Sequence, residues 1–317
     1  APGPMVDYPA KALDFLNRGA TREQLDAQLY AAGVENQPIG VAEADFSGDG
    51  KDDMVISLFD PASSMYPPAG LMVVDVCAEG RFTLAYSLAA GEFEGGPKIW
   101  VAQDLNADGA ADLLVSTTTC GAHTCFDAMQ ILAWNGVTFE NRLDGPTDEL
   151  PYPDAQVTDA DGDGIFTLEV TGSGFGSVGA GPQRAITWIW GYDATSGHWQ
   201  KTGEVLGPSN FRLHVVHDAD GALSRGELDV ALVLYSRVTS DLTLDDWLDP
   251  AAEQATLGAY ARYKTMVVYL MKGQPDLAQA VLTELTTAFP VGTPQHDYAV
   301  MAGQYHDAFL AGRAAVV

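Results

Sequence analysis

A nine-residue acidic pattern that occurs three times constrains the fold of this chain more than any other feature. Each copy has Asp at position 1, oxygen-bearing side chains at positions 3 and 5, and Gly at position 6. The copies read DFSGDGKDD over residues 45–53, DLNADGAAD over 104–112 and DADGDGIFT over 159–167. Apolar residues that alternate as in a β-strand follow the copies. A pattern repeated in register predicts three copies of one small β unit.

The arrangement of oxygen atoms in these loops favours bound calcium. Calcium accepts about six to eight oxygen ligands in flexible geometry, and the glycine at position 6 permits a sharp turn. The predicted ligands are Asp45, Ser47, Asp49, Lys51 and Asp53; Asp104, Asn106, Asp108, Ala110 and Asp112; and Asp159, Asp161, Asp163, Ile165 and Thr167, where Lys51, Ala110 and Ile165 contribute backbone carbonyls. Thr167 replaces the last Asp, which weakens the expected affinity of the third loop. An EF-hand would need Glu at position 12, where these loops have Ile56, Val115 and Val170.

The three loops resemble the FG-GAP or VCBS-type repeat, and the resemblance covers roughly residues 38–208. It implies antiparallel β-sheet repeats in a partial, propeller-like arrangement, calcium as the cofactor and a location outside the cell. The alternative is that these stretches are solvated turns without an ion. Three copies in register make that alternative less favoured.

A second apolar strand, a turn and an aromatic residue follow in each repeat. The second strands are expected near residues 71–76, 129–134 and 186–192. Each repeat should therefore form a small antiparallel sheet of three or four strands. Three such sheets are too few to close a propeller. The open edges must be covered by terminal helices, by a fourth degenerate blade or by another subunit.

The charge balance limits the partners of this chain. Its 317 residues include 43 Asp and Glu against 16 Lys and Arg, for a formal charge of -27. Such an acidic chain is a poor partner for nucleic acid or an anionic membrane. The sequence contains no apolar run of about 18 residues, so no transmembrane segment is predicted. A hydrophobic content of 47% predicts globular domains with ordinary cores.

The cysteines and the first residues fit an exported protein. The chain begins at Ala1 without an initiator Met, as expected after signal-peptide removal or trimming. Cys120 and Cys125 enclose four residues and are predicted to close a hairpin by a disulfide if the protein is exported, which leaves Cys77 over. Millimolar calcium outside the cell suits weak loops. The predicted location is therefore extracellular or in the cell envelope.

Helical patterns flank the repeats. Residues 8–17 and 22–32 predict two short helices, and Thr21 with Gln24 forms a capping-box pattern before the second. From about Phe211 the apolar period becomes 3.6 and continues to the end. The predicted organisation is a helical cover over 1–37, three β repeats over 38–208 and an all-α region over 209–317.

The all-α region resembles tetratricopeptide repeats. The matching positions are Tyr269, Gly273, Ala278, Leu282 and Pro290 in one copy and Ala219, Gly226, Ala231 and Tyr235 in an earlier one. The consensus Trp is missing from both copies, and an insertion over 242–251 lengthens their spacing. The resemblance implies stacked helical hairpins that present a surface to protein partners.

Two other groups of residues have weaker functional interpretations. Residues 174–179 match a dinucleotide-binding glycine pattern, but no helix can begin directly after them because Gly and Pro follow. His214 and His217 have the residue type for zinc together with His296 or His306. Lone histidines on helices are more often packed or surface residues, and we favour that interpretation.

A stripe of aromatic residues gives the remaining binding hypothesis. Ile186, Trp188, Trp190 and Tyr192 alternate onto one face of a predicted strand. Burial under a neighbouring sheet is favoured, and a sugar-stacking platform is the alternative, which keeps a carbohydrate ligand open. The chain has no nucleophile elbow, Walker loop, zinc-protease or kinase signature, so no catalytic residue is predicted.

The sequence thus predicts an α+β protein in which calcium-braced β repeats precede a helical array. The favoured function is non-catalytic: protein binding or self-assembly at the cell surface, as an adhesin or an extracellular structural subunit. The alternatives are a carbohydrate-binding module and a surface hydrolase that uses the β repeats as a scaffold.

Overall fold

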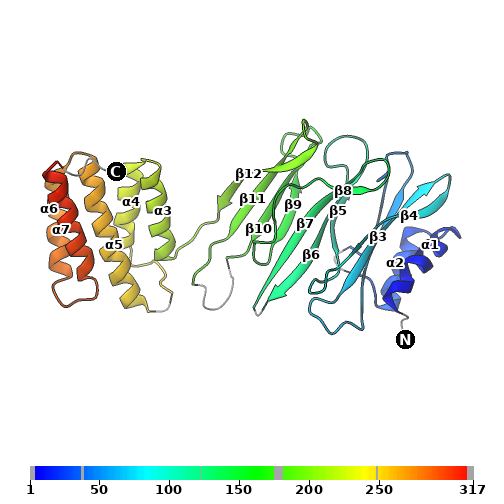
Figure 1. The fold of residues 1–317 in the computed structure, drawn as a ribbon, viewed down its shortest axis with the longest axis horizontal. Helices are drawn as coiled ribbons and strands as arrows, with labels where there is room; N and C mark the ends of the chain where they lie inside the picture. Colours follow the sequence, from blue (N-terminus) through cyan, green and yellow to red (C-terminus); the bar gives the residue numbers. More distant parts are fainter. Residues whose placement is uncertain (1–3, 37–38, 122, 175–180, 248, 313–317) are drawn as a thin grey trace. The chain divides into compact units, whose positions relative to one another are not determined.

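The computed structural model describes residues 4–36, 39–121, 123–174, 181–247 and 249–312 (Figure 1). These residues form three four-stranded antiparallel sheets and seven α-helices, which confirms the predicted mixture of helices and antiparallel strands. The three sheets close into neither a barrel nor a propeller in this part of the chain. The chain divides into two compact units, Ala1–Gly207 and Pro208–Val317.

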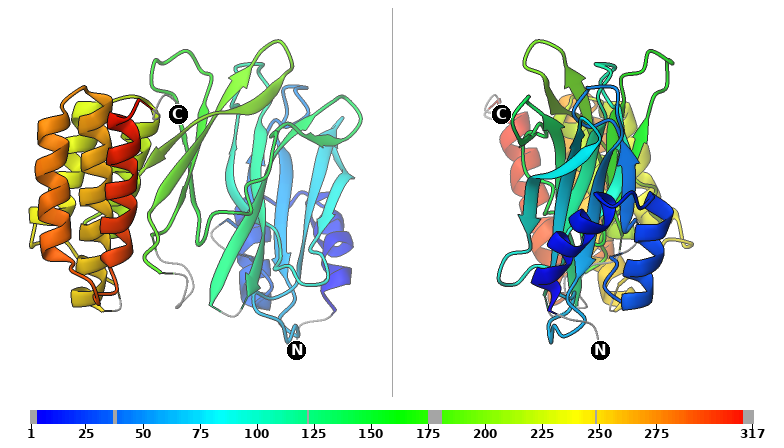
Figure 2. Two further views of the ribbon diagram at one scale, coloured as in Figure 1. Left: turned by 60° about the vertical axis from the view of Figure 1, so that its left-hand side comes forward. Right: turned by 90° about the vertical axis from the view of Figure 1, so that its right-hand side faces the viewer.

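Two helices precede the sheets, close to the predicted positions. A short 3-10 turn, Met5–Asp7, leads into α1 (Tyr8–Leu16), and α2 (Arg22–Ala32) follows. The predicted capping box is formed, since the Thr21 side chain accepts the Gln24 backbone N–H and the Gln24 side chain accepts that of Thr21. The helices lie against one face of the first sheet (Figure 2). Their buried residues, such as Leu25 and Leu29, share a core with that sheet.

The strands of each sheet follow one another in sequence order. The first sheet holds β1 (Val41–Ala44), β2 (Asp53–Phe59), β3 (Gly70–Ala78) and β4 (Arg81–Ala89); the second holds β5 (Lys98–Gln103), β6 (Asp112–Gly121), β7 (Thr124–Trp134) and β8 (Phe139–Asn141); the third holds β9 (Asp154–Thr158), β10 (Thr167–Gly172), β11 (Ile186–Asp193) and β12 (His198–Leu206). Every neighbouring pair is antiparallel. Each acidic loop joins the first strand of a sheet to its second.

Apolar cores fill the spaces between successive sheets. The core between the first and second sheets includes Phe46, Val55 and Ile99, and the core between the second and third includes Leu105 and Leu168. Alternation along each strand sends successive side chains to opposite cores. Burial of apolar area at about 25 cal/mol per Å² on both faces of the middle sheet is the main stabilisation of this unit.

Five helices form the second unit, as the period of 3.6 predicts. They are α3 (Arg212–Ser224), α4 (Leu228–Ser240), α5 (Pro250–Met271), α6 (Pro275–Ala288) and α7 (His296–Leu310). A buried ion pair between Arg212 on α3 and Asp246 stabilises the connection between α4 and α5, where the insertion was predicted. Asp220 on α3 accepts hydrogen bonds from the hydroxyls of Tyr235 on α4 and Tyr260 on α5, so three helices share one carboxylate.

Candidate metal centre

The first residue of each acidic loop folds the loop around its own carboxylate. In the first loop Asp45 accepts the backbone N–H of Gly50 at 2.7 Å, and it also accepts that of Asp49 at 3.1 Å. Asp49 in turn accepts the N–H of Lys51 at 3.0 Å. Gly48 and Gly50 both have positive φ, which glycine adopts without steric cost. These contacts fix the turn that the glycine spacing predicted.

The other two loops repeat the same pair of hydrogen bonds. In all three, the carboxylate at position 1 accepts the N–H of the glycine at position 6, and the carboxylate at position 5 accepts the N–H at position 7. The pairs in the second loop are Asp104 with Gly109 and Asp108 with Ala110, both at 2.9 Å; those in the third are Asp159 with Gly164 at 3.0 Å and Asp163 with Ile165 at 2.8 Å. Three segments far apart in sequence therefore adopt one conformation.

The Asp at position 9 is buried in the first two loops, where it begins a strand. Asp53 accepts the N–H groups of Ser47 and Cys77, each at 2.7 Å. Burial raises the pKa of the Asp53 carboxyl, and these two N–H groups oppose the rise. Asp112 accepts the N–H of Leu105 at 3.1 Å. Burial raises the pKa of Asp112 to about 7, and the neighbouring Asp108 and Asp104 add to the rise.

The third loop brings its carboxylates closest together. One oxygen from each of Asp159, Asp161 and Asp163 lies within 4.8 Å of the other two, and this is the one such group of three among the residues that the structure describes. Thr167, predicted to weaken this loop, is half-buried at the start of β10. Asp161 favours cation binding by this loop, because it is a carboxylate at position 3, where the other loops have Ser47 and Asn106.

The donor set of the first loop fits a hard cation. Ser47 Oγ, at ligand position 3, is shielded from solvent and has no hydrogen-bond partner. A buried hydroxyl oxygen without a partner costs free energy of about 1–3 kcal/mol, and a cation in the loop would remove that cost. Calcium prefers carboxylate, hydroxyl and carbonyl oxygens, which are the groups present here.

Backbone hydrogen bonds join each loop to the next. Asp45 O accepts the N–H of Ala111 at 2.7 Å, and Leu105 O accepts that of Phe166 at 2.8 Å. Phe46 and Leu105, at position 2 of their loops, are fully buried in the cores between the sheets. Each of these bonds links one loop to the end of the next loop, directly before the strand that follows it. The sequence pattern alone did not indicate this link.

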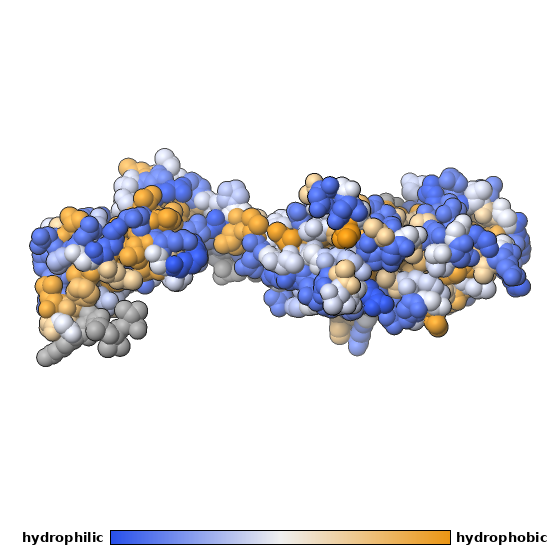
Figure 3. Space-filling view, turned by 90° about the horizontal axis from the view of Figure 1, so that it is seen from above, coloured by the Kyte–Doolittle hydropathy of each residue, from blue (hydrophilic) through white to orange (hydrophobic). Residues whose placement is uncertain are grey.

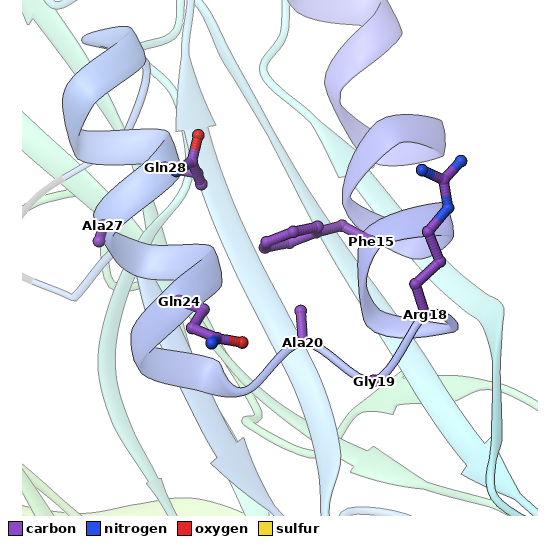
Figure 4. A pocket seen from close by; sticks show the side chains of 7 residues that line it. All are labelled: Phe15, Arg18, Gly19, Ala20, Gln24, Ala27 and Gln28. Atoms are coloured by element: carbon purple, nitrogen blue, oxygen red, sulfur yellow. The ribbon is translucent and has the colours of Figure 1, made fainter.

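A shallow pocket of about 480 Å³ lies between α1 and α2 (Figure 4). Phe15 points across it towards the helix that carries Gln24 and Gln28. The Arg18 guanidinium at its rim, in the turn after α1, is ion-paired with Asp14 of that helix. Nothing at this pocket matches a predicted site.

The other predicted groups have structural roles. Cys120 and Cys125 form the predicted disulfide at the end of the β6–β7 hairpin, and Cys77 is a buried thiol. His214 Nδ1 lies 2.7 Å from Ser209 Oγ, and no group of His residues able to hold zinc forms in the described ranges. Most of the dinucleotide-like stretch 174–179, namely residues 175–179, lies outside the described residues.

The tryptophan stripe belongs mainly to the core, as the favoured interpretation predicted. Trp190 is fully buried, and its indole N–H donates to Asp144 O at 3.0 Å. Trp199 is also buried. The ammonium group of Lys201 lies 3.8 Å from the ring centre of Trp188 and covers that face. These contacts leave little aromatic surface for stacking on a sugar.

Comparisons with known proteins place this chain in no family. No protein-family model and no curated protein matches it. Among solved structures, the Bacillus licheniformis rhamnogalacturonan lyase PL11 is similar with a TM-score of 0.35 and 11% identity, over 52% of this chain and 33% of the lyase chain. A score this low does not show a common fold. Among the described residues, no helix has the length and apolar character needed to cross a membrane.

Proposed function

We propose that this chain is an exported, non-catalytic protein whose β repeats are braced by calcium and which binds protein partners or assembles at the cell surface. The observation that carries this proposal is the common conformation of the three acidic loops. Each wraps the same two carboxylates around the same backbone N–H groups. The shared conformation is what three copies of one cation-binding unit would have.

In this proposal, calcium has a structural role. The ion would be held by the side-chain oxygens at positions 1, 3, 5 and 9 and by the carbonyl at position 7, as predicted. The first loop contains four carboxylates within nine residues and the other two contain three each, and their mutual repulsion opposes folding. A divalent cation neutralises two of these charges and so favours the folded loop. The resemblance to FG-GAP and VCBS repeats supports this role.

Two features of the β unit support a location outside the cell, where calcium is plentiful. The first unit, Ala1–Gly207, contains all three loops. The disulfide between Cys120 and Cys125 fits an oxidising compartment.

The helical unit, with its resemblance to tetratricopeptide repeats, supports a role in protein binding. A carbohydrate-binding role is less favoured because Trp190 and Trp199 are buried.

Calorimetric titration of the whole chain with CaCl2 tests this proposal directly. We expect saturable binding at two or three sites, with dissociation constants on the order of 0.1–1 mM as in extracellular calcium modules. MgCl2 should compete weakly, because magnesium requires a smaller octahedral site. An absence of saturable calcium binding would remove the main support for the proposal.

A further inference from the structure

β4, one of the two outer strands of the first sheet, differs from the rest of this acidic chain. Residues 82–91 contain no charged side chain, although hydrophilic residues cover most of the face seen in Figure 3. Leu84 on this strand is 53% exposed. Natural proteins protect edge strands with charges, proline, bulges or short length. Apart from one bulge in its pairing with β3, β4 lacks these protections.

The other outer strands are shorter or carry charged side chains. β1, β5 and β9 are all shorter than β4, and they contain Glu43, Lys98 and Asp154, respectively. β8 has only three residues and contains Glu140. β12 carries Lys201 and Glu204, and at Trp199 its outer edge is already paired with residues 142–144. The long uncharged edge of β4 is therefore specific to this strand.

The outer backbone groups of β4 are unpaired over most of its length. The Asn17 side chain bonds both the N–H and the C=O of Phe82, so Phe82 faces outward. The N–H of Ala90 donates inward to Gly70 O. By the alternation of a strand, the N–H groups of Ala89 and Ser87 point outward. In the described part of the chain, Asn17 is the one side chain hydrogen-bonded to this outer edge.

We propose that β4 is a self-association edge, on which β4 of a second copy of this chain adds as an antiparallel strand. The ends of the strand carry opposite charges. Arg81 at its start and Glu92 after its end are both exposed, and neither has an ion-pair partner among the described residues. Antiparallel pairing with Ser87 of one copy opposite Ser87 of the other, with the extra residue of the bulge between Leu84 and Tyr86, brings Arg81 of each copy near Glu92 of the other. No like charges then face each other across the pair.

Exposed aromatic residues lie on loops near one end of this edge. Phe93 follows β4 and is 73% exposed, and Tyr66, on the loop that leads to β3, is 83% exposed. The two loops meet where Gly96 N donates to Pro68 O at 2.8 Å. Exposed aromatic side chains are common anchors of protein interfaces. The pairing of two identical strands is isologous, so it forms a closed dimer.

This inference names a partner for the assembly part of the proposed function. The β4 edge contains none of the acidic-loop residues. Self-association and calcium binding are therefore tested by separate measurements, and the failure of one leaves the other result interpretable.

The first test is sedimentation velocity of the whole chain over a concentration series. The wild type should show a concentration-dependent dimer. Ser87→Pro removes the outward N–H without breaking the inner ladder and should lower the association constant about tenfold, because symmetry removes two hydrogen bonds. Ser87→Ala, which keeps the N–H, is the matched control and should dimerise normally. A wild type that stays monomeric, or a Ser87→Pro variant that associates like Ser87→Ala, would overturn the proposal.

A charge exchange supplies the second test, and it leaves the strand backbone intact. Arg81→Glu should weaken the dimer, because two acidic side chains then face each other at both ends. The double variant Arg81→Glu/Glu92→Arg restores opposite charges and should restore dimerisation. If the double variant associates no better than Arg81→Glu, the antiparallel self-pairing is wrong.

Discussion

Substitution of a loop carboxylate should remove part of the calcium-dependent stability of the β unit. An ion that binds only the folded state stabilises it by RT ln(1 + [L]/Kd). With Kd on the order of 0.1–1 mM and calcium at about 10 mM, each site contributes about 1.4–2.7 kcal/mol. For a unit of this size, Ala1–Gly207, that corresponds to a rise in Tm of about 3–10 °C per site.

Asp49→Ala and Asp108→Ala test this magnitude, because both residues occupy position 5 of their loops. Each variant also loses a backbone hydrogen bond, so the useful quantity is the Tm difference between calcium and excess chelator within one variant. That difference should fall by the contribution of one site. Asp148→Ala, an exposed Asp outside the loops, is the matched control. If both loop variants keep the full calcium shift of the wild type, the loops are not calcium sites.

Three further predictions concern groups outside the loops. Burial raises the pKa of Asp75 to about 7, so without calcium the stability of the fold falls as pH rises from about 4 to about 7. Asp75→Asn should have a higher Tm than the wild type at pH 8, and a lower Tm would contradict this. Arg212→Met leaves Asp246 buried without its partner and should cost about 3–5 kcal/mol in urea unfolding, whereas Arg212→Met/Asp246→Leu should recover most of it. Replacement of Cys120 and Cys125 by Ser opens a short loop and should cost about 2 kcal/mol, measured as a lower midpoint in denaturant; an unchanged midpoint would refute this.

Local patterns in the sequence predicted much of this fold. The loop spacing located the second strand of each sheet, because Asp53 and Asp112 begin β2 and β6 as the pattern required. The capping box at Thr21 located α2 within the predicted residues. These features depend on neighbours in the chain, so a local pattern is sufficient to find them.

Features that depend on contacts distant in sequence were not predictable in the same way. The hydrogen bond from the N–H of Ala111 to Asp45 O joins the loops of two successive repeats, and no local pattern encodes it. The role of Asn17 at the edge of β4 likewise joins a helix end to a strand far along the chain. The weakness assigned to the third loop came from Thr167 alone. Asp161, also a predicted ligand, adds a carboxylate at position 3 of the same loop.

Each of the three loops has three carboxylates at its predicted ligand positions, but one of the three is placed differently in the third loop. The third carboxylate is Asp53 or Asp112 in the first two loops, buried at the start of a strand, and it is the exposed Asp161 in the last. Because burial raises the pKa of Asp53 and Asp112, bound calcium must displace a proton there over part of the acidic range. The same ion would also compensate a charge inside the fold. Calcium binding at the first two loops would therefore be coupled to folding and to pH, whereas the exposed cluster of the third loop would bind the ion without burying its additional charge.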